Sequence, residues 1–389
     1  MGCPAAYIVT SVEHHDQTWT KVHLDAFRGA AALIVALGHA RGLFFFSLTG
    51  KTAAHELTIG DEAVMAFFVL SGYLVGGSVL RDMKAGTWDW PSYLIKRLVR
   101  LWVVLIPAVF IGILIDSIGF HYLSGKGSIY SFPAGQIYVL PNNLDELHSL
   151  TTIVGNIVFL QTIFVPTLGT NASLWSLSNE FWYYLLFPMG MLAIRYCSNA
   201  LSRLAYSVGV AVIFSLLGIH GSILFLTWLS GAALSILPRQ IPARHANWAV
   251  SIAGVAFVIF FLGIKRLHLQ LYLSELVVAM AVCALIYTVK CQVTPCRSFF
   301  YSRIAGWFSK ISYSLYLTHL PLLILGCALL NTPWEKSRVA PAMLIKFSVD
   351  FAAAIAWAAL VYHLFEAKTD TVRSATTAIT RNFGFVLRR

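Results

Sequence analysis

Charged residues are scarce in this chain. They make up 12% of its 389 residues, against 58% hydrophobic residues. A soluble domain usually carries about 25% charge because its surface must be solvated, so the composition excludes an ordinary soluble protein. Apolar runs of roughly 17 to 25 residues, long enough to cross a hydrocarbon core of about 30 Å, recur along the chain. These runs do not alternate between apolar and polar residues, so they predict helices rather than a membrane barrel.

Several catalytic motifs are also missing. The chain contains no G-x-S-x-G elbow, no Walker A sequence, no H-E-x-x-H and no His-x4-Asp, which removes support for nucleotide hydrolysis and zinc proteolysis. The cysteines are scattered, mostly in or beside apolar runs, where cysteine behaves as a small apolar residue. Cys291 and Cys296 share a loop, but no second pair accompanies them. The sequence therefore predicts no metal site and no tightly bound cofactor.

Long apolar spans are present instead, and the mean hydropathy is +0.72. We predict ten spans, at 29–47, 61–80, 98–118, 179–196, 206–219, 223–237, 248–264, 272–289, 311–330 and 341–365. A shorter apolar piece, 152–166, predicts a re-entrant or interfacial helix, with an eleventh span as the alternative. The expected fold is an all-α polytopic membrane protein with about ten transmembrane helices.

The distribution of charge predicts the topology. The chain has 28 Lys and Arg against 17 Asp and Glu, a net charge of +11. With ten spans and an inner N-terminus, most basic residues fall on the inner side, as the positive-inside rule requires. We therefore predict cytoplasmic termini and no nucleic-acid partner. The predicted segments are a cytoplasmic segment (1–23), a transmembrane domain (24–365) and a basic cytoplasmic tail (366–389).

The first span, LDAFRGAAALIVALGHARG, carries ionisable residues that are costly in a membrane and hence candidates for function. His39 follows Arg28 by eleven positions, which places both within roughly 20° of one helix face, about 16 Å apart. Asp25 lies on the same side. A cation at the inner mouth and a deep imidazole, which can accept and return a proton near neutral pH, suit a charged donor. The alternative is an interfacial Asp25–Arg28 ion pair with His39 bonded to another helix.

Two arginines open the third span, in SYLIKRLVRLW. Arg97 and Arg100 are three positions apart and so project from one face. Paired guanidinium groups suit phosphate because each offers forked donors and keeps its charge. The alternative, an anchor to lipid headgroups, is equally compatible with this segment.

The fourth and ninth predicted spans each carry a polar stripe. Ser176 and Glu180 are four positions apart in LWSLSNEFWYYLLFP, and Tyr316 and His319 share a face in ISYSLYLTHLP. A carboxylate near the bilayer surface can orient a histidine or bind sugar hydroxyls. The alternative for both stripes is hydrogen bonding between helices.

Taken together, five segments resemble the acyltransferase-3 family of bacterial membrane acyltransferases. They are LDAFRGAAALIVALGH at 24–39, FFVLSGYLVGG at 67–77, KRLVRLWVVLIP at 96–107, WSLSNEFWYYLLFP at 175–188 and SYSLYLTH at 312–319. The resemblance implies a ten-span fold with a cytoplasmic entrance for acyl-CoA. Members of the family acylate surface polysaccharides, peptidoglycan, other glycans or antibiotics, usually on oxygen.

The resemblance also implies roles for individual residues. The family's Arg-x10-His motif falls on Arg28 and His39, and its Arg-x-x-Arg motif on Arg97 and Arg100. His39 would be the catalytic base, the arginines would hold the CoA phosphates, and Glu180 matches a family carboxylate that we count as catalytic. Supporting residues are expected at Asp25, Ser176, Tyr316 and His319.

The sequence thus predicts an O-acyltransferase of a bacterial inner membrane. Its co-substrate would be acyl-CoA, with an acetyl or succinyl group, and its acceptor a hydroxyl of a carbohydrate or cell-envelope glycan. The alternative is a secondary transporter of a polar or anionic solute, which also combines many helices with intramembrane charge. Transporters often contain inverted repeats, and no internal repeat is visible in this sequence.

Overall fold

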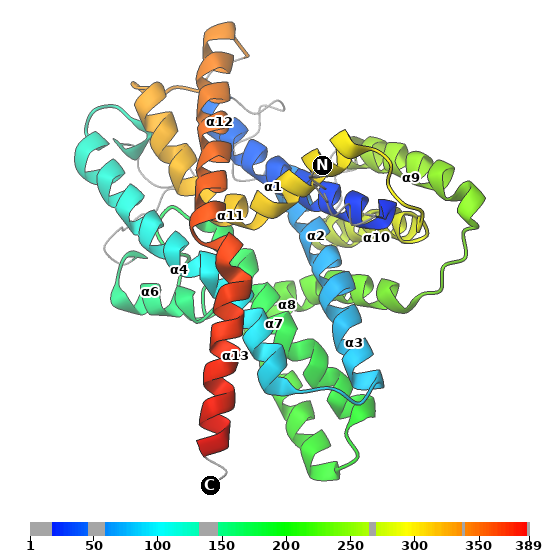
Figure 1. Cartoon of the computed structure of the whole chain (residues 1–389). Helices are drawn as coiled ribbons and strands as arrows, with labels where there is room; N and C mark the ends of the chain where they lie inside the picture. Colours follow the sequence, from blue (N-terminus) through cyan, green and yellow to red (C-terminus); the bar gives the residue numbers. More distant parts are fainter. Residues whose placement is uncertain (1–17, 46–58, 132–146, 264–269, 337–338, 387–389) are drawn as a thin grey trace, which may run out of the picture.

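The computed structural model describes residues 18–45, 59–131, 147–263, 270–336 and 339–386. In these ranges the chain forms helices and no β-strand. Most helices gather into one bundle, from which α12 and α13 extend as a long rod that ends near the C-terminus (Figure 1). The predicted all-α class is therefore confirmed.

In chain order the helices are α1 (Trp19–Phe44), α2 (Ile59–Ser71), α3 (Gly77–Lys84), α4 (Trp90–Leu123), α6 (Leu150–Ile157), α7 (Trp175–Met191), α8 (Ala200–Ile236), α9 (Ala243–Gly263), α10 (Leu271–Lys290), α11 (Phe299–Leu330), α12 (Pro341–Leu364) and α13 (Thr369–Val386). Two π-helical turns, η2 (Gly72–Gly76) and η5 (Leu192–Tyr196), extend α2 and α7. The 3-10 turns are η3 (Ile129–Ser131), η4 (Ala172–Leu174) and η7 (Glu366–Lys368).

Within the described chain, seven helical stretches are long and apolar enough to cross a membrane. They are Glu62–Lys84, Trp90–Leu123, Ala200–Ile236, Arg244–Phe261, Tyr272–Lys290, Phe299–Leu330 and Pro341–Thr380. α8 counts once, although Gly218 (φ 65°, ψ −167°) breaks it between the two spans predicted there. α1 and α7 lie at the first and fourth predicted spans but are not among the seven. A multi-pass helical membrane protein is confirmed; ten crossings and cytoplasmic termini stay predictions.

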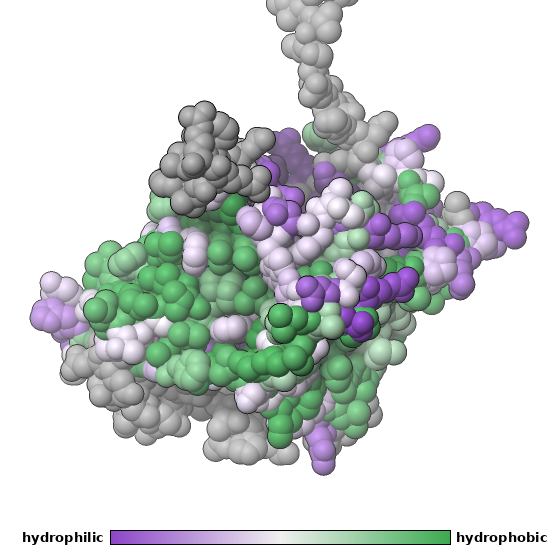
Figure 2. All heavy atoms as spheres, turned by 90° about the horizontal axis from the view of Figure 1, so that it is seen from below, coloured by the Kyte–Doolittle hydropathy of each residue, from purple (hydrophilic) through white to green (hydrophobic). Residues whose placement is uncertain are grey.

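The outer surface of the bundle is suited to lipid. Large apolar side chains are exposed on several helices, among them Phe110 (58%), Leu114 (61%) and Ile252 (67%). Figure 2 shows that much of one face is hydrophobic, with hydrophilic residues gathered toward one side. In water such a surface would favour aggregation, so it supports burial of these helices in a bilayer.

Two segments refine the predictions made for them. The piece 152–166 contains most of α6, a helix of eight residues, which at about 1.5 Å per residue is too short to span a bilayer. The chain then turns through positive φ angles at Phe159 (62°) and Thr162 (67°). In the predicted basic tail, 366–389, the described residues are helical: η7 and α13 continue the direction of α12, and α13 packs on α4.

The start of α4 is fixed by a cap. Asp89 accepts a hydrogen bond from the backbone N–H of Ser92 at 2.9 Å, and Pro91 occupies the first turn, an arrangement that favours helix initiation. Hydrogen bonds from the side chain and the backbone of Ser92 hold the pKa of Asp89 below its usual value. This cap sets the register in which Arg97 and Arg100 project, about two and three turns later.

Glycines let the central helices approach closely. A Cβ atom on Gly29 of α1 would lie 2.7 Å from Cβ of Phe308 on α11. At the contact of η2 with α8, a Cβ atom on Gly72 would lie 1.8 Å from the carbonyl oxygen of Trp228. Close backbone approach through small residues is the usual way in which membrane helices associate.

A carbonyl group left without a helical donor by a proline in α11 bonds to the irregular segment before α7. Pro321 has no N–H, so the carbonyl of Leu317, four residues earlier, has no helical donor. Asn171 takes its place: its side-chain N–H donates to the Leu317 carbonyl oxygen at 2.8 Å, and both partners are buried. This bond fixes the segment before α7 against the stretch of α11 that carries Tyr316 and His319.

We expect Asn171→Ala to lower the free energy of unfolding by roughly 1–3 kcal/mol, because a buried carbonyl loses its donor. The same change should cost less in a Pro321→Ala background, where the restored N–H can reach Leu317. Thermal unfolding of the four proteins in detergent measures both quantities. If Asn171→Ala lowered the free energy of unfolding equally in both backgrounds, Asn171 would not be replacing the N–H that Pro321 lacks.

Candidate active site

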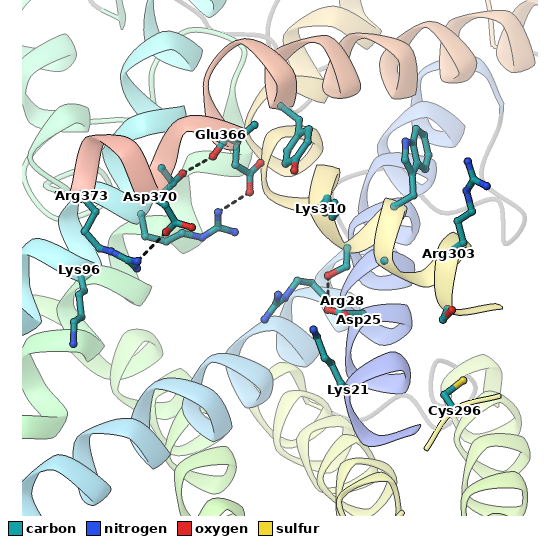
Figure 3. Close-up of a pocket in the computed structure, with 18 of the residues that line it drawn as sticks. Lys21, Asp25, Arg28, Lys96, Cys296, Arg303, Lys310, Glu366, Asp370 and Arg373 are labelled. Carbon is teal, nitrogen blue, oxygen red and sulfur yellow. Dashed lines mark hydrogen bonds and ion pairs between the residues drawn. The ribbon is translucent and has the colours of Figure 1, made fainter. Parts of the chain in front are cut away.

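A large basic cavity opens between α1, α4, α11 and the start of α13. Its volume is about 1280 Å³, above the roughly 300–1,000 Å³ usual for small-molecule sites. We call it the basic vestibule. Its basic lining residues are Lys21, Arg28, Lys96, Arg97, Arg100, Arg297, Arg303, Lys310 and Arg373, and its acidic ones are Asp25, Glu366 and Asp370. Figure 3 shows the labelled members of this set arranged around one space. The excess of basic side chains favours an anionic ligand.

A smaller cavity, the inner chamber, lies next to the vestibule. Its volume is about 300 Å³. Arg28, Arg97 and Arg100 line both cavities and so stand where the two meet. The other lining residues are mostly apolar or hydroxylic: Val64, Phe67, Phe68, Leu70, Ser71, Leu74, Val75, Leu101, Ser176, Leu177, Glu180, Tyr184, Ser312, Tyr313 and Tyr316. The structure thus brings together the three arginines that the sequence singled out in two separate segments.

Arg100 is held by a carboxylate that the sequence did not single out. Its guanidinium lies 2.6 Å from Oε1 of Glu366 and 5.0 Å from the ring centre of Tyr313. The other oxygen, Oε2, accepts bonds from the backbone N–H (3.2 Å) and hydroxyl (2.6 Å) of Ser314. Glu366 lies in η7, in the segment predicted as a polar tail. Its position just after the last apolar run is the only signal for it in the sequence.

The other two arginines are compensated to different degrees. Arg97 donates to the Ser78 hydroxyl at 3.1 Å and lies over the rings of Tyr93 (5.3 Å) and Tyr184 (5.7 Å). Arg28 makes no hydrogen bond or ion pair with any residue that the structure describes. Asp25 instead accepts a bond from the Ser309 hydroxyl at 2.8 Å. Of the three arginines that line both cavities, Arg28 is thus the one whose N–H donors are most available to a ligand.

Glu180 and Ser176 line the inner chamber but bond to different partners. The Tyr184 hydroxyl donates to Oε1 of Glu180 at 2.5 Å, and the hydroxyls of Ser176 and Tyr316 lie 2.6 Å apart. No hydrogen bond joins Glu180 to His39 in the described chain, so Glu180 does not orient that histidine here. Glu180 stands instead in the same chamber as Arg28.

His39 and His319 form a pair between α1 and α11. Nδ1 of His39 lies 2.9 Å from Nε2 of His319, and the rings stack with centres 5.1 Å apart. Nδ1 of His319 contacts the carbonyl oxygens of Leu315 (2.8 Å) and Tyr316 (3.0 Å). Neither histidine lines the inner chamber, but Tyr316 does, and its ring centre lies 6.3 Å from that of His319. The pair is therefore behind the Tyr316 end of the chamber.

Residues 22–363 match the family model described as an acyltransferase domain, the acyltransferase-3 model. The chain belongs to the acyltransferase-3 family. The match covers most of the chain, including the histidine pair and the three arginines that line both cavities. This membership favours the predicted acyltransferase over the transporter alternative, and it agrees with the resemblance carried by the five sequence segments.

Two curated acyltransferase relatives are similar to parts of this acyltransferase-3 chain. Acyltransferase MdmB of Streptomyces mycarofaciens is 29% identical over 175 residues, which is 44% of this chain and 39% of the relative. Peptidoglycan O-acetyltransferase OatA of Listeria monocytogenes serovar 1/2a is 26% identical over 302 residues, 70% of this chain and 46% of the relative. The chain spans less than half the length of each. No solved structure matches it.

We expect Glu366→Ala in this acyltransferase-3 protein to lower the free energy of unfolding by roughly 1–3 kcal/mol, because the buried donors of Ser314 lose their acceptor. Glu366→Gln should cost less, since its amide oxygen can still accept from Ser314. Thermal unfolding in detergent compares the two variants with the wild type. An unchanged melting temperature for Glu366→Ala would show that this carboxylate does not hold η7 to α11.

Proposed function

We propose that this protein is a membrane O-acyltransferase that moves an acyl group from acyl-CoA to a hydroxyl of a carbohydrate or cell-envelope glycan. The observation that carries the proposal is the junction of the two cavities at three arginines. A basic vestibule suits the phosphates of CoA, and a narrow, largely apolar chamber suits its uncharged arm and thioester. The membership of the acyltransferase-3 family supplies the reaction class.

The three arginines would contribute differently to binding of the CoA phosphates. Arg28 offers a guanidinium that makes no hydrogen bond or ion pair in the described chain, although the Asp25 and Glu180 carboxylates interact with it electrostatically. Arg97 and Arg100 are already oriented by Ser78 and Glu366. Charge-assisted, forked hydrogen bonds from guanidinium groups are among the strongest contacts to phosphate. The thioester would then point along the chamber toward the contact between Ser176 and Tyr316.

His39 would act as general base. It removes the proton of the acceptor hydroxyl as the oxygen attacks the thioester carbonyl, so that a C–O bond forms and the C–S bond breaks. The proton then passes from His39 to the leaving sulfur, which gives free CoA. Because the histidine pair lies behind Tyr316, the Ser176–Tyr316 contact must open for the thioester to reach it.

The comparisons support the choice of acceptor and of membrane. One relative is by name a peptidoglycan O-acetyltransferase, and both come from bacteria. We therefore propose a bacterial plasma membrane, a glycan acceptor and an acetyl donor, with succinyl-CoA as the second donor to test.

We expect His39→Ala to lower kcat by about 10²–10⁴-fold, the usual contribution of a general base. The measurement is release of free CoA from acetyl-CoA and succinyl-CoA by purified protein in nanodiscs, with a panel of glycan acceptors. Acceptor-dependent release that is lost in folded His39→Ala protein supports the proposal. If neither donor binds or turns over, and Arg28→Ala and His39→Ala instead alter solute flux in liposomes, the protein is a transporter.

Arg28→Ala should weaken CoA binding by about tenfold or more, because a charge-assisted hydrogen bond contributes roughly 1.5–3 kcal/mol. Titration calorimetry of CoA in nanodiscs measures the dissociation constant. The matched control is Lys84→Ala, which removes an exposed basic residue at the end of α3 that lines neither cavity. Equal affinities for the two variants would remove Arg28 from the phosphate site.

A further inference from the structure

The direction of the hydrogen bonds around His319 is fixed by its backbone partners. Nδ1 of His319 lies 2.8 Å from the Leu315 carbonyl oxygen and 3.0 Å from that of Tyr316. A carbonyl oxygen can only accept, so Nδ1 must carry the hydrogen. In a neutral imidazole the other nitrogen is then an acceptor. Nε2 of His319 therefore presents a lone pair to its neighbour.

That neighbour is His39, and its protonation follows. Nδ1 of His39 lies 2.9 Å from Nε2 of His319. Since the latter accepts, Nδ1 of His39 must donate. Neutral His39 then holds its lone pair on Nε2, the nitrogen on the far side of the ring from His319. Two backbone carbonyls on α11 thus decide, through one imidazole, which nitrogen of a second imidazole on α1 is basic.

The surroundings of His319 favour the neutral form of this arrangement. His319 is fully buried (0% exposed) in a helix interface, where an uncompensated charge is costly. In the part of the chain that the structure describes, no carboxylate contacts it. Histidine bases are often oriented by a carboxylate that also stabilises the imidazolium. Here the orienting group is a neutral imidazole, so it can fix the hydrogen without adding a charge.

We propose that His319 is a positioning residue that holds His39 as the Nδ1–H tautomer, with Nε2 as the proton-accepting atom. The inference rests on the proposed function, in which Nε2 of His39 accepts the proton of the acceptor hydroxyl. In a merely structural role, His319 would only stabilise α11 or its packing on α1. Either nitrogen of His39 could then carry the hydrogen.

Two substitutions separate the halves of the His319 ring. In His319→Gln the side-chain oxygen reaches the former place of Nε2, where it can accept from His39. In His319→Asn the amide reaches only the former place of Nδ1, where it can donate to the Leu315 and Tyr316 carbonyls but not meet His39. Asn therefore keeps the contact within α11 and loses the contact with His39, and Gln does the reverse.

We expect His319→Gln to retain kcat within about tenfold of the wild type and His319→Asn to lose about 10²-fold or more, part of the contribution of a general base. The KM for acetyl-CoA should change in neither. Thermal unfolding checks that both variants are folded. Equal activity of the two variants, or higher activity of Asn, would overturn the proposal.

A second measurement needs no substrate. In protein carrying ¹⁵N-labelled histidine, the ring ¹⁵N shifts of His39, assigned by difference from His39→Ala, report which nitrogen is protonated. We expect Nδ1–H in the wild type and in His319→Gln, and a shift toward Nε2–H in His319→Asn. Nε2–H in the wild type would overturn the proposal. Nδ1–H in a protein that transfers no acyl group would refute the proposed function alone.

Discussion

A polar group inside a hydrocarbon layer must find its partner within the protein, because no water is available to satisfy it. Much of this fold follows from that requirement. Pro188 deprives the Tyr184 carbonyl of its helical donor, and the buried Tyr93 hydroxyl donates to it at 2.9 Å. The ammonium of Lys290 donates to three carbonyl oxygens at the end of α8, those of Leu234, Ser235 and Leu237. Helix ends and proline sites thereby become the points at which segments distant in sequence are joined.

The three arginines between the cavities meet the same requirement to different degrees. Arg100 has a carboxylate, Arg97 has a hydroxyl and two aromatic faces, and Arg28 has neither among the described residues. A fully paired arginine is well oriented but contributes less net charge to an incoming anion. An arginine without a hydrogen-bond partner, such as Arg28, can offer all its donors to the anion but is costly to keep out of water, and the Asp25 and Glu180 carboxylates offset part of that cost. Its place at the wall of a large basic vestibule, where solvent or an anion can reach it, makes that cost tolerable.

Periodicity and apolar runs were sufficient to predict the all-α class, and the family motifs singled out Arg28, Arg97 and Arg100, which the structure brings together; the catalytic role of His39 stays a prediction. They were not sufficient for Glu366 or for the bond between His39 and His319. Both contacts join residues more than 250 positions apart, with separations of 266 and 280. Spacing within one helix reports only which side chains share a face; it does not report which faces meet. The sequence around Glu366 also gave no sign of its burial. A carboxylate just after the last apolar run is expected to be solvated, whereas η7 places Glu366 in the protein interior.

The position of the histidine pair constrains how two substrates can meet. The chamber is shared with the basic vestibule at its arginine end and carries Ser176 and Tyr316 in its lining, while the histidines lie behind Tyr316 and outside both cavities. A donor held by its phosphates in the vestibule, with its thioester in the chamber, would therefore approach His39 from the Tyr316 side. An acceptor sharing that route would have to pass the arginines and the bound CoA. We therefore infer that the acceptor hydroxyl reaches the imidazole from the opposite side. The barrier between the two routes would then be the Ser176–Tyr316 hydrogen bond, 2.6 Å long and buried, which keeps the thioester from water until it opens.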